Sequence, residues 1–387
     1  MDIVVFHLTP DFGPDYTLTV KELRERGHTV IWGSVDDRGK VIWHNGKAMI
    51  HEMNGPDQLI QNGGISRLTA INQYRGFFDE MIEYLRSLKP DVVQFEPDPL
   101  KMVWYASRSL SKDTVVIQDI KQINLGVCHK MRAKIGDWRR MNSIRFRGLY
   151  TFDHTLVDYR YVAQAVFGEN WQKVSSEIPV GIAPSFLTIV RPEQPLADKE
   201  EPVRFVYIGV IDKFRELETL IYACKEMTKR TQNFRLDLIG PDRANGYYQD
   251  LIEELDIADN VRIKDPVPYE DIPSVLNSGY EVGVAYNPIR PTWHMQPTIK
   301  VLEYRALGMP IISSDVLSHH DFVEQGVNGL LVENTVEAWS EAMLRFVYDR
   351  QFLDFVYQNA LVRRRGNTAA DVARMHEEVY LKLLQKK

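Results

Sequence analysis

Short apolar runs alternate with longer helical stretches along both halves of the sequence. The runs are residues 2–8, 29–33 and 92–95 in the first half, and 204–210, 236–239, 261–263 and 281–286 in the second. Apolar runs of this length, separated by helices, are typical of parallel strands that are buried on both faces. The alternation predicts an α/β fold in which each half of the chain forms a Rossmann-like parallel sheet.

The length and composition of the chain allow two domains with separate cores. The sequence has 387 residues, of which 44% are hydrophobic. Residues 191–202 are rich in Pro, Glu and Lys and lack periodicity, so we expect them to link the domains. The predicted domains are residues 1–190 and 203–365, and residues 366–387 add a C-terminal helix.

Charge, cysteine content and the N-terminus narrow the class of protein. A formal net charge of −6 argues against general nucleic-acid binding. Cys128 and Cys224 lie far apart and have no metal-ligand spacing, so neither a disulfide framework nor a zinc site is predicted. The chain enters a strand after Asp2, and no apolar stretch approaches the ~20 residues that cross a bilayer. We therefore expect a cytoplasmic protein.

The stretch from Pro291 to Asp315 carries the first chemical signal. We expect a loop, a helix with Pro297 in its first turn and Gly308 at its C-terminal end, and then a buried strand over residues 309–313. Lys300 and Glu303 are three residues apart, so they share one side of that helix near its N-terminus. A helix N-terminus suits a phosphate, and a carboxylate can accept two hydrogen bonds from a ribose. The hypothesis is a sugar-nucleotide site, and the alternative is a solvated Lys–Glu pair on an amphipathic helix.

The same stretch resembles the donor site of a known enzyme family. The pattern Pro297-x-x-Lys300-x-x-Glu303-Tyr304-x-Ala306-x-Gly308-x-Pro310 resembles the donor-site segment of family-4 retaining glycosyltransferases of the GT-B fold. Residues 326–332, GVNGLLV, match the late turn and strand of that family. The resemblance covers residues 202–350 well and residues 1–190 in outline. It implies two Rossmann-like domains that face each other across a cleft, with the C-terminal helix returning to the N-terminal domain.

The resemblance also implies roles for individual residues. Arg215 stands where the family has a phosphate-binding Lys, so Arg215, Lys300 and Glu303 are the candidate catalytic residues. The implied donor-binding residues are Gly13, Gly209, Val267, Met295, Gln296, Pro297, Thr298 and Ile299. Three positions depart from the family pattern: Met295 replaces its first glutamate, Val210 a phosphate-binding arginine, and Gln118 a histidine close to the reacting sugar.

Two acids and Gln118 are candidate contacts for the acceptor or the sugar. Glu96 and Asp98 follow the strand predicted over residues 92–95, at the end of a parallel strand where open α/β sheets bind ligands. The alternative is that Glu96 and Asp98 are an ordinary acidic pair in a loop. Gln118 ends the next predicted strand and can form hydrogen bonds to a sugar, but it cannot act as an acid or base.

Residues 129–147 form a basic segment within an acidic protein. The segment has seven Lys or Arg residues and one Asp, a net charge of +6, with Trp138 and Phe146 among them. Such a segment suits anionic lipid headgroups or a pyrophosphate-linked acceptor. Peripheral contact with the inner face of a membrane is one interpretation, and a solvated helical face is the other.

The predicted function is a retaining glycosyltransferase. It would move a sugar from a nucleotide-diphosphate donor to a hydroxyl acceptor in glycan, glycolipid or polysaccharide biosynthesis, and a lipid-linked acceptor is one interpretation. Since Arg215, Lys300 and the helix N-terminus can neutralise the leaving diphosphate, we expect neither a metal nor another cofactor. The alternatives are a sugar-nucleotide epimerase of the same fold and a non-catalytic sugar-nucleotide-binding subunit.

Overall fold

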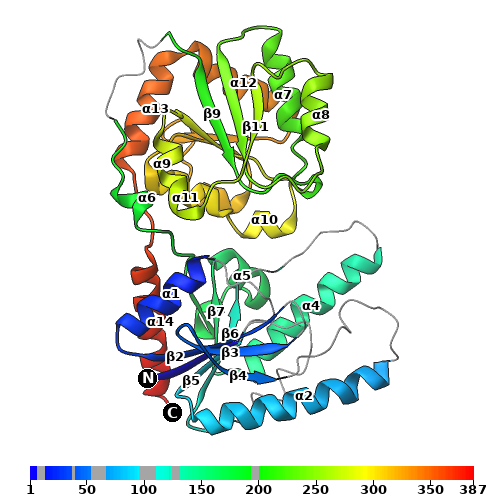
Figure 1. Ribbon diagram of the computed structural model, residues 1–387, viewed down its shortest axis with the longest axis vertical. Coiled ribbons are helices and arrows are strands. Elements are labelled where there is room, and N and C mark those ends of the chain that lie inside the picture. Colours follow the sequence, from blue (N-terminus) through cyan, green and yellow to red (C-terminus); the bar gives the residue numbers. More distant parts are fainter. Residues whose placement is uncertain are drawn as a thin grey trace. The chain divides into compact units, whose positions relative to one another are not determined.

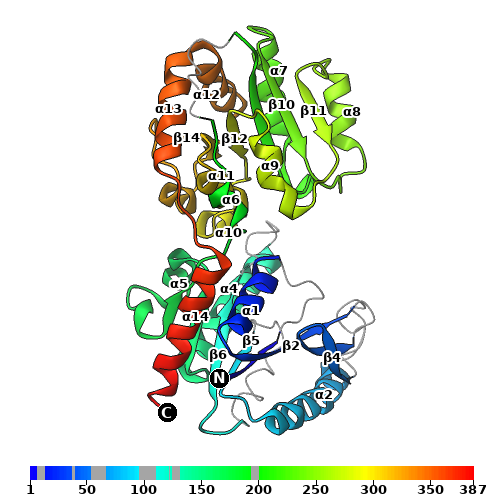
Figure 2. The same ribbon diagram turned by 60° about the vertical axis from the view of Figure 1, so that its left-hand side comes forward.

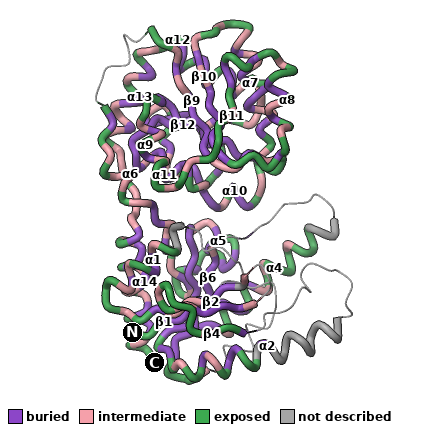
Figure 3. The backbone as a smooth tube through the Cα atoms, in the orientation of Figure 1, coloured by how far each residue is buried: buried purple, intermediate pink, exposed green. Residues whose placement is uncertain are grey.

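The chain forms two α/β units. The computed structural model describes residues 1–6, 14–36, 40–53, 67–95, 110–121, 123, 131–192 and 200–387. The first unit contains Met1–Gly181 together with Asn367–Lys387, and the second contains Ile182–Gly366. Each unit has one mainly or wholly parallel sheet with buried strands (Figures 1 and 3). The prediction of two Rossmann-like units is confirmed.

The first unit is built on an eight-stranded sheet. Its strands are β1 (Asp2–Phe6), β2 (Thr29–Val35), β3 (Val41–Asn45), β4 (Ala48–Met53), β5 (Val92–Phe95), β6 (Val115–Ile120), β7 (His154–Val157) and β8 (Ser175–Glu177). The order is β4-β3-β2-β1-β5-β6-β7-β8, and every pair is parallel except β2–β3 and β3–β4. The antiparallel hairpin turns after Asn45, where the Asn-Gly dipeptide predicts a turn.

Helices from both ends of the chain cover the first sheet. They are α1 (Pro14–Glu25), α2 (Arg67–Leu88), α4 (Met131–Tyr150), α5 (Arg160–Phe167) and α14 (Ala369–Leu384), with a single 3₁₀ turn, η1 (Trp171–Lys173). Helix α14 lies beside α1 (Figures 1 and 2), and its Val372 and Tyr380 join the core formed by Ile3 and Val5. The C-terminal helix is therefore an integral part of the first unit.

The second unit has a six-stranded, wholly parallel sheet. Its strands are β9 (Val203–Ile208), β10 (Phe234–Ile239), β11 (Val261–Lys264), β12 (Val282–Ala285), β13 (Ile311–Ser314) and β14 (Gly329–Val332). The order β11-β10-β9-β12-β13-β14 is the doubly wound order 3-2-1-4-5-6. The strand order reverses between β9 and β12, so the carboxyl ends of these two strands are where such a sheet binds a ligand.

The helices of the second unit follow its strands in alternation. They are α6 (Ser185–Thr188), α7 (Glu218–Thr228), α8 (Tyr247–Glu254), α9 (Ile272–Asn277), α10 (Pro291–Met295), α11 (Ile299–Leu307), α12 (Val336–Tyr348) and α13 (Arg350–Val362), with 3₁₀ turns η2 (Lys213–Arg215), η3 (Tyr269–Asp271) and η4 (Leu317–Asp321). The apolar faces of α7, α8, α12 and α13 join one core with the sheet, which includes Phe205, Leu236 and Trp339.

The stretch from Pro291 to Asp315 differs from its prediction at its start. A short helix, α10, occupies residues where we expected a loop, and Pro291 is its first residue. Helix α11 begins at Ile299, with Thr298 as its extended N-cap, so Pro297 lies before the helix and not in its first turn. The C-terminal end agrees with the prediction, because Gly308 adopts the left-handed conformation at φ 75° that stops a helix.

The chain leaves the first unit ahead of the predicted linker. The division falls between Gly181 and Ile182. Arg191, the first residue of the predicted linker, is 3% exposed, and its guanidinium donates to the carbonyls of Leu276 and Tyr280 at 3.2 and 2.6 Å. The start of that segment is thus packed within the second unit, and residues 193–199 lie outside the described residues.

Candidate functional site

Two glycines shape the sheet edge at the ends of β9 and β10. Gly209 follows β9 at φ 145°, and Gly240 follows β10 at φ 151°. A Cβ added to Gly240 would lie 2.1 Å from the carbonyl oxygen of Gly209, so only glycine permits this approach of the two backbones. Beyond Gly209, the Asp212 carboxylate accepts a hydrogen bond from the Arg215 N–H at 3.0 Å, which closes the 3₁₀ turn η2. The turn holds Arg215 just beyond this sheet edge.

Helix α11 brings Lys300 to the same edge. The Tyr304 hydroxyl accepts from the Ile208 N–H and donates to the Val206 carbonyl, both at 3.1 Å, and thereby anchors α11 on β9. Lys300 is only 4% exposed, and its Nζ lies 4.5 Å from the centroid of the Tyr207 ring. A Cβ at Gly209 would be 3.7 Å from that Nζ. Lys300 therefore lies directly over the end of β9.

Burial changes the proton affinity of Lys300 and Glu303. Burial, and then the charge of Arg215, lowers the pKa of Lys300 well below its usual value, while Glu303 acts in the opposite direction. Burial raises the pKa of Glu303 to about 7, against the opposing effects of Lys300 and the Tyr269 hydroxyl. Glu303 is 3% exposed. The alternative of a solvated Lys–Glu pair is therefore wrong.

Arg215 presents hydrogen-bond donors without acceptors. Its guanidinium lies 5.2 Å from the centroid of the Trp293 ring in α10. Its Nε and Nη1 are buried and have no hydrogen-bond partner in the part of the chain that the structure describes. A planar guanidinium with free N–H groups suits the oxygens of a phosphate. The neighbouring Lys213 is engaged elsewhere, since its Nζ lies 4.3 Å from the centroid of the Tyr247 ring.

A buried histidine supports the N-terminus of α11. The Nε2 of His319 lies 3.4 Å from the Thr298 N–H, and its Nδ1 lies 2.5 Å from the Ser313 hydroxyl. Burial lowers the pKa of His319 to about 3, so the ring is neutral and Nε2 can accept the Thr298 hydrogen bond. By helix geometry, the N–H groups of Ile299 and Lys300 have no acceptor within α11. Sequence reasoning missed His319, because nothing in residues 317–321 marks its contact with residue 298.

The other predicted donor residues occupy varied environments. Met295 ends α10 and is half-buried, Gln296 and Pro297 are buried, and Ile299 is 39% exposed. Val267 is half-buried in the loop after β11, and β11 is separated from β9 by β10 in the sheet. The structure thus gathers Gly209, Arg215, Lys300 and Glu303 at one edge.

Among the candidates of the first unit, only Gln118 lies within the described residues. Gly13, Glu96 and Asp98 fall outside them. Gln118 is 1% exposed on β6, and neither its Nε2 nor its Oε1 has a hydrogen-bond partner among the residues that are described. Its amide is therefore a buried polar group whose hydrogen-bonding capacity is unused in these ranges. Within the same ranges, no three His, Cys, Asp or Glu side chains gather as a metal site would require.

Most of the basic segment forms α4, with an exposed apolar face. Ile135, Trp138 and Phe146 are 46%, 67% and 53% exposed, and their spacing places them on one side of the helix. Lys134, Arg139 and Arg145 are exposed nearby, and Ile144 is buried on the other side. Arg147 is 5% exposed and so does not contribute to the outer surface. One side of α4 is therefore buried, and its exposed side carries both basic and apolar side chains.

Comparison with known proteins extends the geometric result. Residues 191–362 match the family described as Glycosyl transferases group 1. Curated relatives include a D-inositol 3-phosphate glycosyltransferase of Corynebacterium efficiens, 23% identical over 181 residues, or 45% of this chain and 41% of the relative. Another is an alpha-D-kanosaminyltransferase of Streptomyces kanamyceticus, 26% identical over 40% of this chain and 39% of the relative. The chain thus matches about two fifths of the length of these relatives.

Solved structures resemble the whole chain. A sucrose-phosphate synthase from Thermosynechococcus elongatus has a TM-score of 0.71 at 18% identity, covering 100% of both chains. The Anabaena protein HepE, solved in complex with UDP, has a TM-score of 0.70 at 12% identity, covering 99% of this chain and 100% of its own. The chain therefore has the GT-B fold of these glycosyltransferase structures, and its second unit carries a group 1 glycosyl transferase domain.

Proposed function

We propose that the chain is a glycosyltransferase that moves a sugar from a nucleoside diphosphate to a hydroxyl acceptor, with retention at the anomeric carbon. The observation that carries the proposal is the pair of buried guanidinium N–H groups of Arg215, which have no acceptor among the described residues and lie beside the buried Lys300. Both residues lie at the edge of the sheet where the strand order reverses between β9 and β12, which is where such sheets bind ligands. The group 1 match of residues 191–362 supports the same assignment.

The diphosphate would lie between Arg215, Lys300 and the N-terminus of α11. The bond between the anomeric carbon and the oxygen of the β-phosphate breaks, and the acceptor oxygen forms a bond to the anomeric carbon. The leaving diphosphate takes the proton of the acceptor hydroxyl. Negative charge grows on the leaving oxygen, so cations placed there stabilise the transition state more than the ground state. A bound diphosphate also raises the pKa of Lys300 and keeps its ammonium protonated. We propose that these groups act without a metal ion.

Glu303 and Gln118 would bind hydroxyl groups. The Glu303 carboxylate, ionised above its raised pKa of about 7, can accept hydrogen bonds from both ribose hydroxyls. The unpartnered amide of Gln118 can donate to and accept from a hydroxyl of the acceptor or the sugar. A UDP complex is known for HepE, so UDP is the first nucleotide to test.

A panel of nucleotide sugars, incubated with and without lipid-linked and soluble acceptors, tests the reaction. We expect the released nucleoside diphosphate to depend on acceptor and to accompany a glycosylated product of retained configuration. Arg215→Ala should lower this turnover by about 10²–10³, and Lys213→Ala, which removes a cation from the same turn, should leave it intact. An epimerised donor, or tight nucleotide binding without product from any acceptor, would contradict the proposal.

We further propose that α4 associates with anionic membranes. Exposed aromatic side chains beside Lys134, Arg139 and Arg145 suit the headgroup region of a bilayer, where each cation contributes about 1 kcal/mol. No helix in the described ranges is long and apolar enough to cross a membrane.

Vesicle flotation tests the membrane proposal. The protein should float with phosphatidylglycerol vesicles at low salt and return to the soluble fraction at high salt, because salt screens exposed charges. Arg139→Glu/Arg145→Glu should abolish flotation, whereas Arg235→Glu/Arg262→Glu in the second unit should not. If the wild type stays in the soluble fraction at low salt, a soluble acceptor is the better interpretation.

A further inference from the structure

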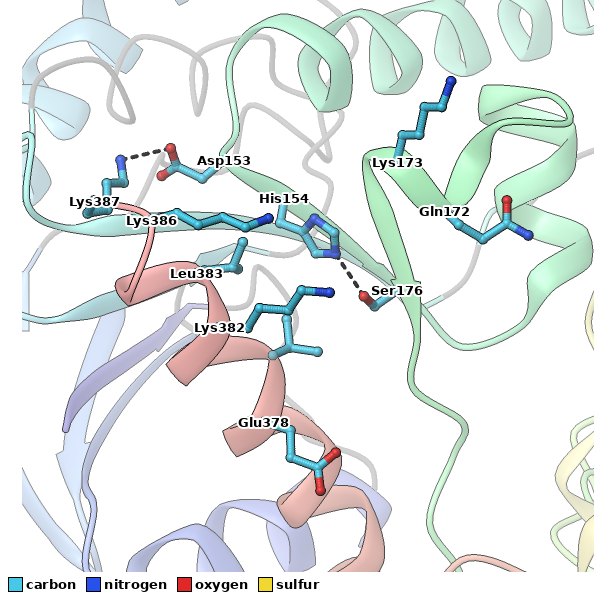
Figure 4. A pocket seen from close by; sticks show the side chains of 11 residues that line it. Asp153, His154, Gln172, Lys173, Ser176, Glu378, Lys382, Leu383, Lys386 and Lys387 are labelled. Atoms are coloured by element: carbon cyan, nitrogen blue, oxygen red, sulfur yellow. Dashed lines mark hydrogen bonds and ion pairs between the residues drawn. The ribbon is translucent and has the colours of Figure 1, made fainter.

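A polar cavity lies in the first unit, at the amino ends of β7 and β8. Its volume is about 410 Å³, within the range of small-molecule sites. It is lined by Asp153 and His154 at the start of β7, the 3₁₀ turn η1, Ser176 of β8 and the last turns of α14. Figure 4 shows Lys382, from α14, and Lys386, from the residues that follow it, extending toward His154 and Ser176. Side chains from three parts of the fold therefore converge on one cavity.

The acidic groups of the cavity are already paired. Asp153 accepts from Lys387 at 2.8 Å through one oxygen and from the Val116 N–H at 2.7 Å through the other. Glu378 lies 3.0 Å from Arg374 on α14. Both carboxylates are therefore neutralised by groups other than the remaining lysines of the cavity.

Three lysines of the cavity keep their charge uncompensated. Within the described ranges, no hydrogen bond or ion pair is found for the side chains of Lys173, Lys382 and Lys386. Lys382 lies in the last turn of α14 and Lys386 just beyond its end, where cations interact favourably with the helix dipole, so these two lysines alone would not indicate a ligand. Lys173 lies in the 3₁₀ turn η1, however, so the dipole of α14 does not account for its position. The cavity as a whole carries an excess of positive charge.

The electrostatic effect of these lysines is visible on His154. Its Nε2 lies 2.8 Å from the Ser176 hydroxyl, at the centre of the group shown in Figure 4. Burial, and then the charges of Lys386 and Lys382, lowers the pKa of His154 to about 4. The imidazole is therefore neutral at pH 7, and the Ser176–His154 pair offers hydrogen bonds without adding charge.

We propose that this cavity binds a phosphoryl group, with Lys382 and Lys386 as its counter-ions and the Ser176–His154 pair as its hydrogen-bonding partner. A phosphoryl group matches the site because it carries up to two negative charges and three acceptor oxygens. The phosphoryl group belongs either to free phosphate and its small esters or to a phospholipid headgroup. This site uses none of the residues of the proposed donor site, so the two proposals stand or fall separately.

Calorimetry with inorganic phosphate and the full chain tests the first source. Lys382→Ala/Lys386→Ala should weaken phosphate binding by about tenfold or more, since two cations next to the anion are lost. Lys47→Ala/Lys112→Ala removes the same charge from exposed positions of the first unit and should have no such effect. Both lysines of the cavity are exposed, so their replacement should not impair folding.

Nuclear magnetic resonance of the His154 imidazole reports on the cavity itself. Phosphate offsets the positive charge of Lys382 and Lys386, so its binding should raise the pKa of His154. The other charged residues that line the cavity are Asp153, Glu378, Lys173 and Lys387. In the absence of phosphate, Lys382→Ala/Lys386→Ala should itself raise the pKa of His154, because it removes two positive charges.

Vesicles of phosphatidylglycerol in phosphatidylcholine test the second source. If Lys382→Ala/Lys386→Ala reduces flotation while the phosphate titration shows no binding, the headgroup of a lipid is the ligand. If the double variant changes neither phosphate binding nor flotation, or if Lys47→Ala/Lys112→Ala causes equal losses, the proposal is overturned.

Discussion

Both units bury polar side chains beside their sheets, but the two groups are completed in different ways. In the first unit the Tyr380 hydroxyl donates to Gln94 Oε1 at 2.5 Å, and Gln94 Nε2 donates to Asp119 at 2.6 Å. In the second unit two N–H groups of Arg215 have no partner among the described residues, and Lys300 is buried against Tyr207. The first group joins two side chains that are 286 positions apart in sequence, whereas the second keeps two donors without a partner in the described ranges.

The difference separates a structural role from a ligand-binding role. A buried donor without an acceptor costs about 1–3 kcal/mol, and proteins retain such groups mainly where a ligand or water completes them. Around Tyr380, the Tyr380 hydroxyl and the Gln94 amide find partners within the protein, and these hydrogen bonds tie α14 to β5 and β6. We therefore expect substitutions in the second unit to act on nucleotide binding and those around Tyr380 to act on stability.

The largest expected effect is on catalysis by Lys300 and Arg215. Lys300→Ala and Arg215→Ala should each lower kcat/KM by about 10²–10³, because each removes a cation from the leaving diphosphate. Thermal denaturation of the same variants is the control, and Lys213→Ala is the matched substitution. If the losses of activity only parallel losses of melting temperature, both residues have a structural role and not a ligand-binding one.

Glu303 should show an intermediate effect with a defined pH dependence. Glu303→Ala should weaken UDP binding by ~1.5–3 kcal/mol, the range for hydrogen bonds to a charged group. The pKa of about 7 means that the carboxylate is lost as pH falls, so the affinity of the wild type should decline below about pH 7. Glu303→Gln should remove this acidic decline, as measured by calorimetry across pH.

The same raised pKa predicts a stability change of opposite sign in the free protein. Between its ordinary pKa of 4.5 and about 7, Glu303 keeps a proton in the native state that the unfolded chain has lost. Its contribution to stability is therefore largest at low pH and falls as pH rises through that window. An unchanged acidic decline of UDP affinity in Glu303→Gln would assign the pH dependence to another group.

The smallest expected effect concerns Tyr380. Tyr380→Phe leaves Gln94 Oε1 without its donor and removes the partner of His376 Nδ1 at 3.0 Å, so it should cost ~1–3 kcal/mol of unfolding free energy. Urea denaturation measures this cost. Tyr348→Phe, which removes an exposed hydroxyl bond to the Arg230 carbonyl, is the control. If Tyr380→Phe stays stable but loses affinity for UDP, the residues around Tyr380 are not purely structural, and the contrast with those around Arg215 fails.

The sequence by itself determined the fold class and the central residues of the candidate site. Apolar runs predicted most strands within two residues, because a strand covered on both faces must be apolar along its length. Lys300 and Glu303 were found because their spacing along one helix is local information, and Gly308 because a helix stop there needs the left-handed conformation.

Only the tertiary structure decided how those residues are surrounded. The burial of Lys300 and Glu303, the support of Thr298 by His319 and the stacking of Arg215 on Trp293 all depend on contacts between separate elements. The polar cavity of the first unit likewise joins β7, η1 and α14. More than 190 residues of sequence separate β7 from α14. Periodicity records which face of an element is buried, but not which distant side chain meets it, because that contact is set by packing.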